Sequence, residues 1–162
     1  MIPSDERYTP EHILDRVREI APIALDPCTT RDNRTKAAAF FALPDDGLTA
    51  AWPETGLVWI NPPYSRGQLY AWASRARSHA AKNAAAEIVM LTPSDLGTSW
   101  GRVLASSAQA AAFLFGRLAF IAPEGPIDTG AKQPSVVWYF GDRKRTFRRA
   151  FHAIATVASM SP

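Results

Sequence analysis

Apolar residues recur along the chain at two spacings, and these spacings predict alternating helices and strands. Near the N-terminus four apolar residues lie three or four positions apart with charged residues between them: Ile13, Leu14, Val17 and Ile20. This spacing predicts an amphipathic helix that packs against a sheet. Thr9 is a favourable N-cap and Pro10 a favourable first helical residue, so we expect the helix to open at Thr9-Pro10-Glu11.

Further elements follow from the same patterns. Short apolar runs predict strands at residues 23–25, 57–60, 87–91, 111–115 and 136–140. Helical spacing predicts helices over residues 69–80 and 97–106, and a terminal helix with Phe147, Phe151, Ile154 and Val157 on one face. Residues 36–43 are compatible with helix or strand. Residues 119–136 contain three prolines and two glycines, which predicts a mobile loop between antiparallel strands.

Strands that alternate with helices are typical of an α/β fold with a mostly parallel sheet. The final strand pair is the expected antiparallel exception, and we expect helices on both faces of the sheet. The chain has 162 residues, of which 47% are hydrophobic and 20% charged. These values predict one globular domain over residues 1–162 with a sizeable core.

Composition excludes several classes of protein. The single cysteine, Cys28, excludes an intramolecular disulfide framework, and three scattered histidines form no metal-ligand cluster. No apolar stretch is long enough to span a bilayer, and the charged N-terminus lacks the apolar core of a signal peptide. We therefore expect a cytoplasmic protein without a metal or a membrane partner. The sequence carries no signal of its oligomeric state.

The tetrapeptide Asn61-Pro62-Pro63-Tyr64 directly follows a predicted strand and suits the methylation of a planar amine. The lone pair of such an amine is spread into its ring, so a catalyst must draw the pair back onto nitrogen. The side-chain carbonyl of Asn61 and the main-chain carbonyl of Pro62 are two acceptors for the two N–H bonds. Consecutive prolines fix the direction of that carbonyl, and Tyr64 offers a flat face for an extruded base.

The alternative interpretation of this tetrapeptide is a strand that ends in a polyproline turn with a packed tyrosine. The position of the motif favours a site. Ligands of open α/β sheets bind at the carboxyl ends of strands, and the wholly apolar run 57–60 fits a strand that is buried on both faces.

Five short motifs occur in an order and spacing that carry a family resemblance. They are Tyr8-Thr9-Pro10, Leu25-Asp26-Pro27-Cys28, Asp46-Gly47-Leu48 followed by Trp52, Asn61-Pro62-Pro63-Tyr64-Ser65, and Gly116-Arg117-Leu118-Ala119-Phe120. From Tyr8 to about Phe140 the chain resembles the phage-type DNA N-6-adenine methyltransferases, a short version of the S-adenosylmethionine-dependent amino-methyltransferases. The resemblance implies an abbreviated Rossmann-like sheet.

The resemblance also implies a pocket for S-adenosylmethionine. Its candidate residues are Tyr8, Thr9, Pro10, Asp26, Pro27, Cys28, Asp45, Asp46 and Asn61. By charge, Asp26 is a candidate for the ammonium group of the cofactor, and Asp45 or Asp46 for its ribose hydroxyls. A turn or cap role is at least as good an interpretation of Asp45 and Asp46. Cys28 fits a small apolar wall better than a nucleophile.

The chain departs from the wider methyltransferase class after its first strand. Residues 26–33 contain no glycine, so the close backbone approach of a glycine-rich turn is absent there. This departure leaves the cofactor contacts open and keeps a non-catalytic role in consideration.

Positive charge is concentrated after the last predicted strand. Five cations lie within seven residues: Arg143, Lys144, Arg145, Arg148 and Arg149. A solvated helix face is one interpretation, and a phosphate-binding surface is the other, because cations at a helix start oppose the helix dipole. Pro63, Ser65 and Arg66 are further candidates for substrate contacts, Trp100 for the base pocket, and residues 121–133 for a recognition loop.

The leading hypothesis is a site-specific DNA adenine methyltransferase. Asn61 and Pro62 hold the amine of a flipped adenine, Tyr64 stacks on the base, and the methyl group comes from S-adenosylmethionine. The alternatives are methylation of an RNA adenine or of a protein glutamine, whose planar amine groups suit the same tetrapeptide. A further alternative is a non-catalytic nucleic-acid-binding protein on a methyltransferase scaffold.

Overall fold

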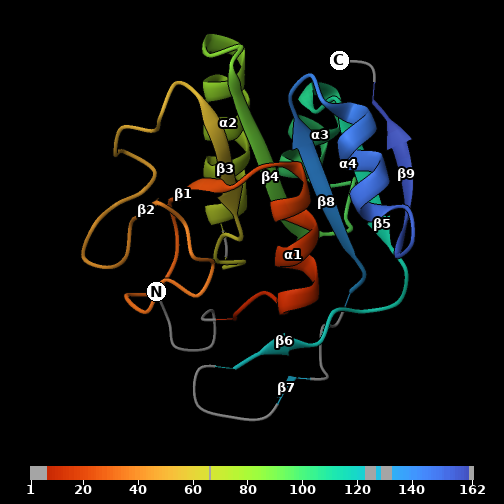
Figure 1. The fold of residues 1–162 in the computed structure, drawn as a ribbon, viewed down its shortest axis with the longest axis horizontal. Coiled ribbons are helices and arrows are strands. Elements are labelled where there is room, and N and C mark those ends of the chain that lie inside the picture. Colours follow the sequence, from red (N-terminus) through yellow and green to blue (C-terminus); the bar gives the residue numbers. More distant parts are fainter. Residues whose placement is uncertain (1–6, 66, 123–126, 129–132, 161–162) are drawn as a thin grey trace.

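The computed structural model describes residues 7–65, 67–122, 127–128 and 133–160. Four helices and nine strands are assigned in these residues (Figure 1). The helices are α1 (Glu11–Ile20), α2 (Gln68–Lys82), α3 (Ser99–Ser107) and α4 (Lys144–Phe151). The strands are β1 (Ile23–Asp26), β2 (Ala39–Phe40), β3 (Gly56–Ile60), β4 (Ala86–Pro93), β5 (Ala110–Leu114), β6 (Phe120–Ile121), β7 (Ile127–Asp128), β8 (Ser135–Phe140) and β9 (Ala155–Ser159).

Seven strands form one open sheet in the order β2-β1-β3-β4-β8-β5-β9. The pairs β2-β1, β1-β3 and β3-β4 are parallel, whereas β4-β8, β8-β5 and β5-β9 are antiparallel. The α/β class is confirmed, but the expectation of a mostly parallel sheet is wrong. Half of the strand pairs are antiparallel, because β8 inserts between β4 and β5 and β9 then adds to the free edge of β5.

Helices cover both faces of this sheet, and the strands alternate between two apolar cores. On one face α1 and α4 pack on side chains such as Trp59, Val89 and Tyr139. On the other face α2 and α3 pack on strand residues that adjoin these in sequence, such as Ile60 and Trp138. The burial of successive strand residues on opposite faces explains why the runs 57–60 of β3 and 136–140 of β8 are wholly apolar.

Two predicted helix boundaries are wrong. α1 begins at Glu11 with Pro10 as its N-cap, and no side chain caps it, so Thr9 is not the capping residue. At the other end of the chain, α4 stops at Phe151 and Val157 lies in β9 opposite Ala112. The free edge of β5 offers backbone groups that a β-branched segment satisfies, and this pairing overrides the helical spacing.

The predicted loop at residues 119–136 does connect the antiparallel strands β5 and β8, but it is not wholly irregular. Phe120–Ile121 and Ile127–Asp128 pair as the small sheet β6-β7, and Ile121 also bridges to Tyr8. Residues 123–126 and 129–132, which include much of the proposed recognition loop, lie outside the described residues. Among the described helices, none is long and apolar enough to cross a membrane.

Candidate active site

The topology of the sheet places a crevice between β1 and β3. The chain leaves β1 for β2 on one side and returns through β3 on the other side, so the direction of the strand order reverses at β1. Open α/β sheets bind ligands at such a point, outside the carboxyl ends of the strands. Asp26 ends β1 and Asn61 directly follows β3. The fold therefore brings together two candidates that are 35 residues apart in sequence.

The side chain of Asn61 has partners at both of its ends. Its Nδ2 donates hydrogen bonds to the carbonyl oxygen of Arg7 and to Oγ1 of Thr9, each at 3.1 Å. Its Oδ1 accepts a hydrogen bond from the hydroxyl of Tyr64 at 3.2 Å. The amide group is thus held between the segment before α1 and the motif to which it belongs.

A small cavity lies on the Tyr64 side of this amide and is lined by Arg7, Asn61, Pro62 and Tyr64; we call it the Asn61 cavity. Among the described residues, no donor bonds the main-chain carbonyl of Pro62. The ring of Tyr64 meets Phe120 edge to face, with 6.3 Å between ring centroids. Burial raises the pKa of the Tyr64 hydroxyl, so this group is a neutral donor at physiological pH.

A second cavity, the Asp26 cavity, shares Arg7 and Asn61 with the Asn61 cavity and is also lined by Tyr8, Thr9, Asp26 and Trp59. Asp26 is only 2% exposed. It accepts hydrogen bonds from neutral donors, the Thr35 hydroxyl at 2.8 Å and the Cys28 backbone N–H at 3.2 Å. Burial nevertheless raises its pKa from 3.8 to about 6. A buried carboxylate that costs free energy marks a candidate binding site for a cation.

The segment before α1 closes one side of the Asp26 cavity. Tyr8 exchanges two backbone hydrogen bonds with Ile121, at 2.9 and 3.0 Å. The guanidinium of Arg34 lies 3.9 Å from the centre of the Tyr8 ring. These contacts fix the segment over the cavity from two directions.

A third cavity of about 300 Å³, the Asp45 cavity, adjoins the Asp26 cavity and shares Cys28 and Pro63 with it. Both Asp45 and Asp46 line it. Asp46 holds its own turn, because its carboxylate accepts from Leu48 N–H and from the Thr49 hydroxyl. Among the described residues, the carboxylate of Asp45 has no such partner. Asp45 is therefore the better ribose candidate of the two.

Residues 26–33, from the last residue of β1 onward, contain no glycine, but Gly47 from another segment packs closely against this turn. Gly47 packs so tightly on the Pro27 carbonyl that an added Cβ would lie 1.7 Å from that oxygen. The Trp52 indole N–H donates to the Gly47 carbonyl at 2.8 Å and holds the turn in place. The close backbone approach is therefore made between residues 27 and 47, not within residues 26–33.

Cys28 is half-buried between the Asp26 and Asp45 cavities. Burial and then the charge of Asp26 raise the pKa of its thiol well above the usual value. A thiol in this environment stays protonated and is a poor nucleophile. Its position agrees with the interpretation of Cys28 as a wall residue.

A family model for DNA N-6-adenine-methyltransferase (Dam) matches residues 3–160, nearly the whole chain. The chain belongs to this Dam family. The expected family resemblance is confirmed, and with it a methyltransferase class whose general activity is on adenine in DNA. A search of curated proteins finds no match to the chain. Among the described residues, no group of three or more histidine, cysteine, aspartate or glutamate side chains is placed to hold a metal ion.

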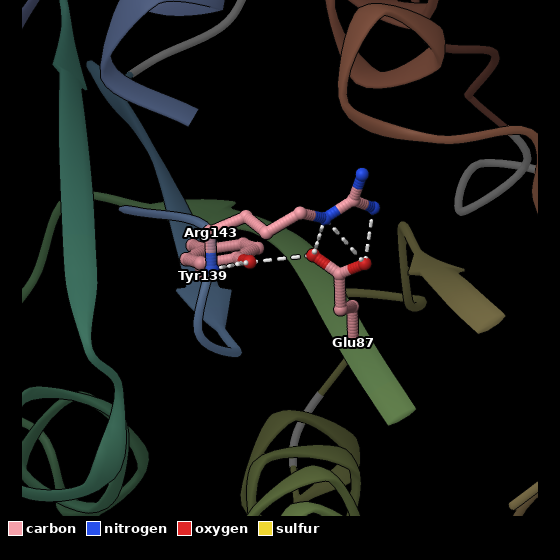
Figure 2. A network of polar contacts seen from close by, with 3 residues as sticks. All are labelled: Glu87, Tyr139 and Arg143. Carbon is pink, nitrogen blue, oxygen red and sulfur yellow. Dashed lines mark hydrogen bonds and ion pairs between the residues drawn. The ribbon is translucent and has the colours of Figure 1, made fainter. Parts of the chain in front are cut away.

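The basic cluster after β8 is not part of this site. β8 is antiparallel to β4, so its last residue, Phe140, lies beside Ile88 near the amino end of β4. Asn61 follows the carboxyl end of β3, so the cluster begins at the opposite end of the strands. In Figure 2 the Arg143 guanidinium donates hydrogen bonds to the Glu87 carboxylate, and the Tyr139 hydroxyl donates to the same carboxylate at 2.5 Å. The other four cations of the cluster, Lys144, Arg145, Arg148 and Arg149, are exposed on α4.

Other candidates differ in how close they lie to the site. Ser65 and Pro63 line the Asp45 cavity. Trp100 is half-buried on α3 against the second core and is not in the walls of the three cavities. Arg66 lies outside the described residues. Pro10 bonds the first turn of α1 through its carbonyl, since Ile13 N–H donates to it at 3.0 Å.

Some residues that contact the site were not candidates in the sequence, among them Thr35, Arg34 and Phe120. Thr35 donates to Asp26, Arg34 covers Tyr8, and Phe120 supports Tyr64. Thr35 and Arg34 lie in a segment without apolar periodicity, so no pattern in the sequence marks them. Phe120 belongs to a recognised motif, but only the fold shows that it meets Tyr64.

Proposed function

We propose that this protein is a DNA adenine methyltransferase that uses S-adenosylmethionine and modifies a flipped adenine at its exocyclic amine. The observation that carries the proposal is that Asn61 lines two cavities at once. One cavity contains a buried carboxylate, and the other is lined by the acceptors and the aromatic ring of the Asn-Pro-Pro-Tyr motif. A methyl transfer needs the methyl donor and the acceptor amine held next to each other, so that the amine attacks the methyl carbon in line with the carbon–sulfur bond.

The target amine is activated by two carbonyl oxygens. Asn61 Oδ1 and the Pro62 carbonyl accept its two hydrogens, which shifts electron density onto the nitrogen as it attacks. A bound S-adenosylmethionine would supply the methyl carbon to this nitrogen, and the electron pair of the broken carbon–sulfur bond would go to sulfur. The amine then loses one proton to solvent, so charge balances without a covalent enzyme intermediate.

The residues of the Asp26 and Asp45 cavities fit S-adenosylmethionine. Asp26 is an acceptor for the ammonium group, and the positive charge of that group offsets the cost of ionising the buried carboxyl. Asp45 is an acceptor for ribose hydroxyls, and Phe41 and Leu48 in the same cavity are apolar walls for a purine ring. When bound, this cofactor supplies a methyl group on a positively charged sulfur. Thr9, Asn61 and Pro63 line the approach to it.

Tyr64 contributes a stacking surface for the base. Its ring is fixed by Phe120, and its neutral hydroxyl remains bonded to Asn61. A base that has left the duplex loses its stacking partners, and an aromatic face restores about 1–3 kcal/mol of that loss.

The test is to incubate the protein with unmethylated DNA and methyl-labelled S-adenosylmethionine, digest the DNA to nucleosides and identify the labelled one. The proposal predicts label in N6-methyldeoxyadenosine. An unlabelled DNA, with label in RNA or in protein glutamine when these are offered in parallel incubations, would redirect the substrate assignment. Cofactor binding without any transfer would support a non-catalytic role.

A further inference from the structure

Thr9 is a buried polar residue that does not make the expected helix-capping hydrogen bond. It is only 7% exposed. Its Oγ1 instead accepts a hydrogen bond from Asn61 Nδ2 at 3.1 Å, across 52 residues of sequence. Thr9 also lines the Asp26 cavity, so this residue links the wall of the proposed methyl-donor cavity to the amide of Asn61.

The orientation of the Asn61 amide depends on these contacts. The oxygen and nitrogen of a carboxamide have similar shapes, and only hydrogen bonds decide which of the two faces a substrate. The Arg7 carbonyl and Thr9 Oγ1 take both hydrogens of Nδ2, and the Tyr64 hydroxyl donates to Oδ1. A flipped amide would set its oxygen against the Arg7 carbonyl and its hydrogens toward the target amine. In the observed orientation the oxygen bonds the Tyr64 hydroxyl, and Asn61 and Tyr64 both line the Asn61 cavity.

The segment that carries Thr9 is itself anchored. Tyr8 is paired with Ile121 through two backbone hydrogen bonds and lies under Arg34. Thr9 therefore offers its hydroxyl from a fixed position. Of the two contacts to Nδ2, only the one from Thr9 is made by a side chain, so substitution can remove it selectively.

We infer that Thr9 is a positioning residue whose hydroxyl holds the Asn61 amide with its carbonyl oxygen toward the target amine. This inference rests on the proposed function. Loss of the hydroxyl leaves one Nδ2 hydrogen of a half-buried amide without a partner and lets the amide populate unproductive orientations.

Thr9→Val and Thr9→Ser separate the hydroxyl from the packing. In single-turnover assays Thr9→Val is expected to lower the rate of methyl transfer about tenfold or more, while cofactor affinity changes by no more than about threefold. Thr9→Ser keeps the hydroxyl and is expected to retain most of the rate. A normal rate in the valine variant overturns the inference, and so does equal damage in both variants.

Thr92→Val is a matched control because Thr92 is a fully buried threonine whose hydroxyl accepts from the Trp138 indole at 2.9 Å. It is expected to lower stability while leaving the transfer rate of the folded protein unchanged. An equal loss of rate in this control would show that any buried threonine change disturbs transfer, which overturns a specific role for Thr9.

A second measurement does not depend on transfer. The side-chain amide signals of Asn61, identified by their loss in Asn61→Ala, are expected to exchange slowly with solvent in the wild type and in Thr9→Ser, and rapidly in Thr9→Val. Unchanged exchange in Thr9→Val overturns the inference. If the wild-type protein transfers no methyl group, the proposed function fails, and this measurement still reports whether Thr9 holds Asn61.

Discussion

The sheet has two ends along its strand direction, one at the amino end of β4 and one at the carboxyl ends of β1 and β3. The polar groups at these two edges differ in how fully they are satisfied. At the edge with the amino end of β4, the Glu87 carboxylate meets the Arg143 guanidinium and the Tyr139 hydroxyl, and that hydroxyl also accepts from the Arg143 backbone N–H (Figure 2). At the edge with the carboxyl ends of β1 and β3, Asp26 is buried among neutral donors and the Pro62 carbonyl has no donor among the described residues.

Unsatisfied polar groups mark the part of the sheet where a ligand can bind. A network whose charges and donors satisfy one another stabilises the start of α4 and needs no ligand. A buried carboxyl with a raised pKa and open acceptors is held at a cost to the fold, and a ligand can recover that cost. The clearest charge signal in the sequence, the cluster after β8, lies at the satisfied edge.

The largest expected effect is that of Asn61→Ala. It removes an acceptor that acts on the amine mainly in the transition state, so the barrier should rise by about 3 kcal/mol or more and turnover should fall at least about a hundredfold. Cofactor affinity should stay nearly intact. Rapid-quench transfer assays and calorimetric titration measure the two quantities, and near-normal methylation by a folded variant would contradict the assignment.

Asp26→Asn should abolish high-affinity cofactor binding and stabilise the ligand-free protein. The wild-type carboxyl ionises near pH 3.8 when unfolded and at about pH 6 when folded. Its contribution to stability is therefore full below pH 3.8 and is lost as the pH rises through 6. Above that pH the asparagine variant should be more stable by up to roughly 3 kcal/mol.

Urea unfolding at pH 4.5 and pH 8 tests this, since the advantage of the Asp26→Asn variant should be present at pH 8 and smaller at pH 4.5. A variant that is less stable at both values would show that the carboxyl serves the fold.

Tyr64→Ala should weaken productive DNA binding by roughly 1–3 kcal/mol, whereas Tyr64→Phe should largely preserve it. The dependence of single-turnover rates on DNA concentration measures the effect. Equal damage in both variants would instead assign the main role to the hydroxyl that bonds Asn61.

Tyr139→Phe probes the satisfied edge. It removes the hydroxyl that Glu87 and the Arg143 backbone share, and it should cost about 1–2 kcal/mol of unfolding free energy. Transfer by the folded variant should not change. A loss of transfer that exceeds the loss of folded protein would show that the two edges are coupled.

Neutralising Lys144, Arg145, Arg148 and Arg149 has the smallest expected effect. If these cations contact phosphates, each lost contact should flatten the log–log dependence of DNA binding on salt by about 0.9. Their place on α4, which begins at the edge opposite Asn61, favours an unchanged slope. Salt titrations of duplex binding distinguish the two, and a flattened slope would extend the DNA surface to this helix.

Much of the fold could be predicted from the sequence, because strongly periodic or wholly apolar segments became helices and strands close to their expected bounds. α2 and β3 are examples. β9 could not be predicted, because Ile154 and Val157 continue the helical spacing of α4 and only the free edge of β5 decides otherwise. The same edge explains why the sheet has more antiparallel pairs than expected.

The site was predictable only in its parts that form local motifs. Asn61, Pro62 and Tyr64 line one cavity as their adjacency suggests. Thr9 is a residue type that favours the N-cap position, yet its hydroxyl bonds a residue that is distant in sequence. The contact of Gly47 with Pro27 could not be predicted either, because a close approach between two separate segments produces no regular pattern in the sequence.

The most direct test of the proposed function determines whether the methyl label goes to the exocyclic amine of adenine, which Asn61 is proposed to hold. Two duplexes of the same sequence are compared as substrates, one normal and one in which purine deoxyriboside, which lacks the 6-amino group, replaces every deoxyadenosine. With labelled S-adenosylmethionine, we expect label in the normal duplex and none in the substituted one. Equal labelling of both duplexes would contradict the proposed function, because the methyl group would then be going to another atom.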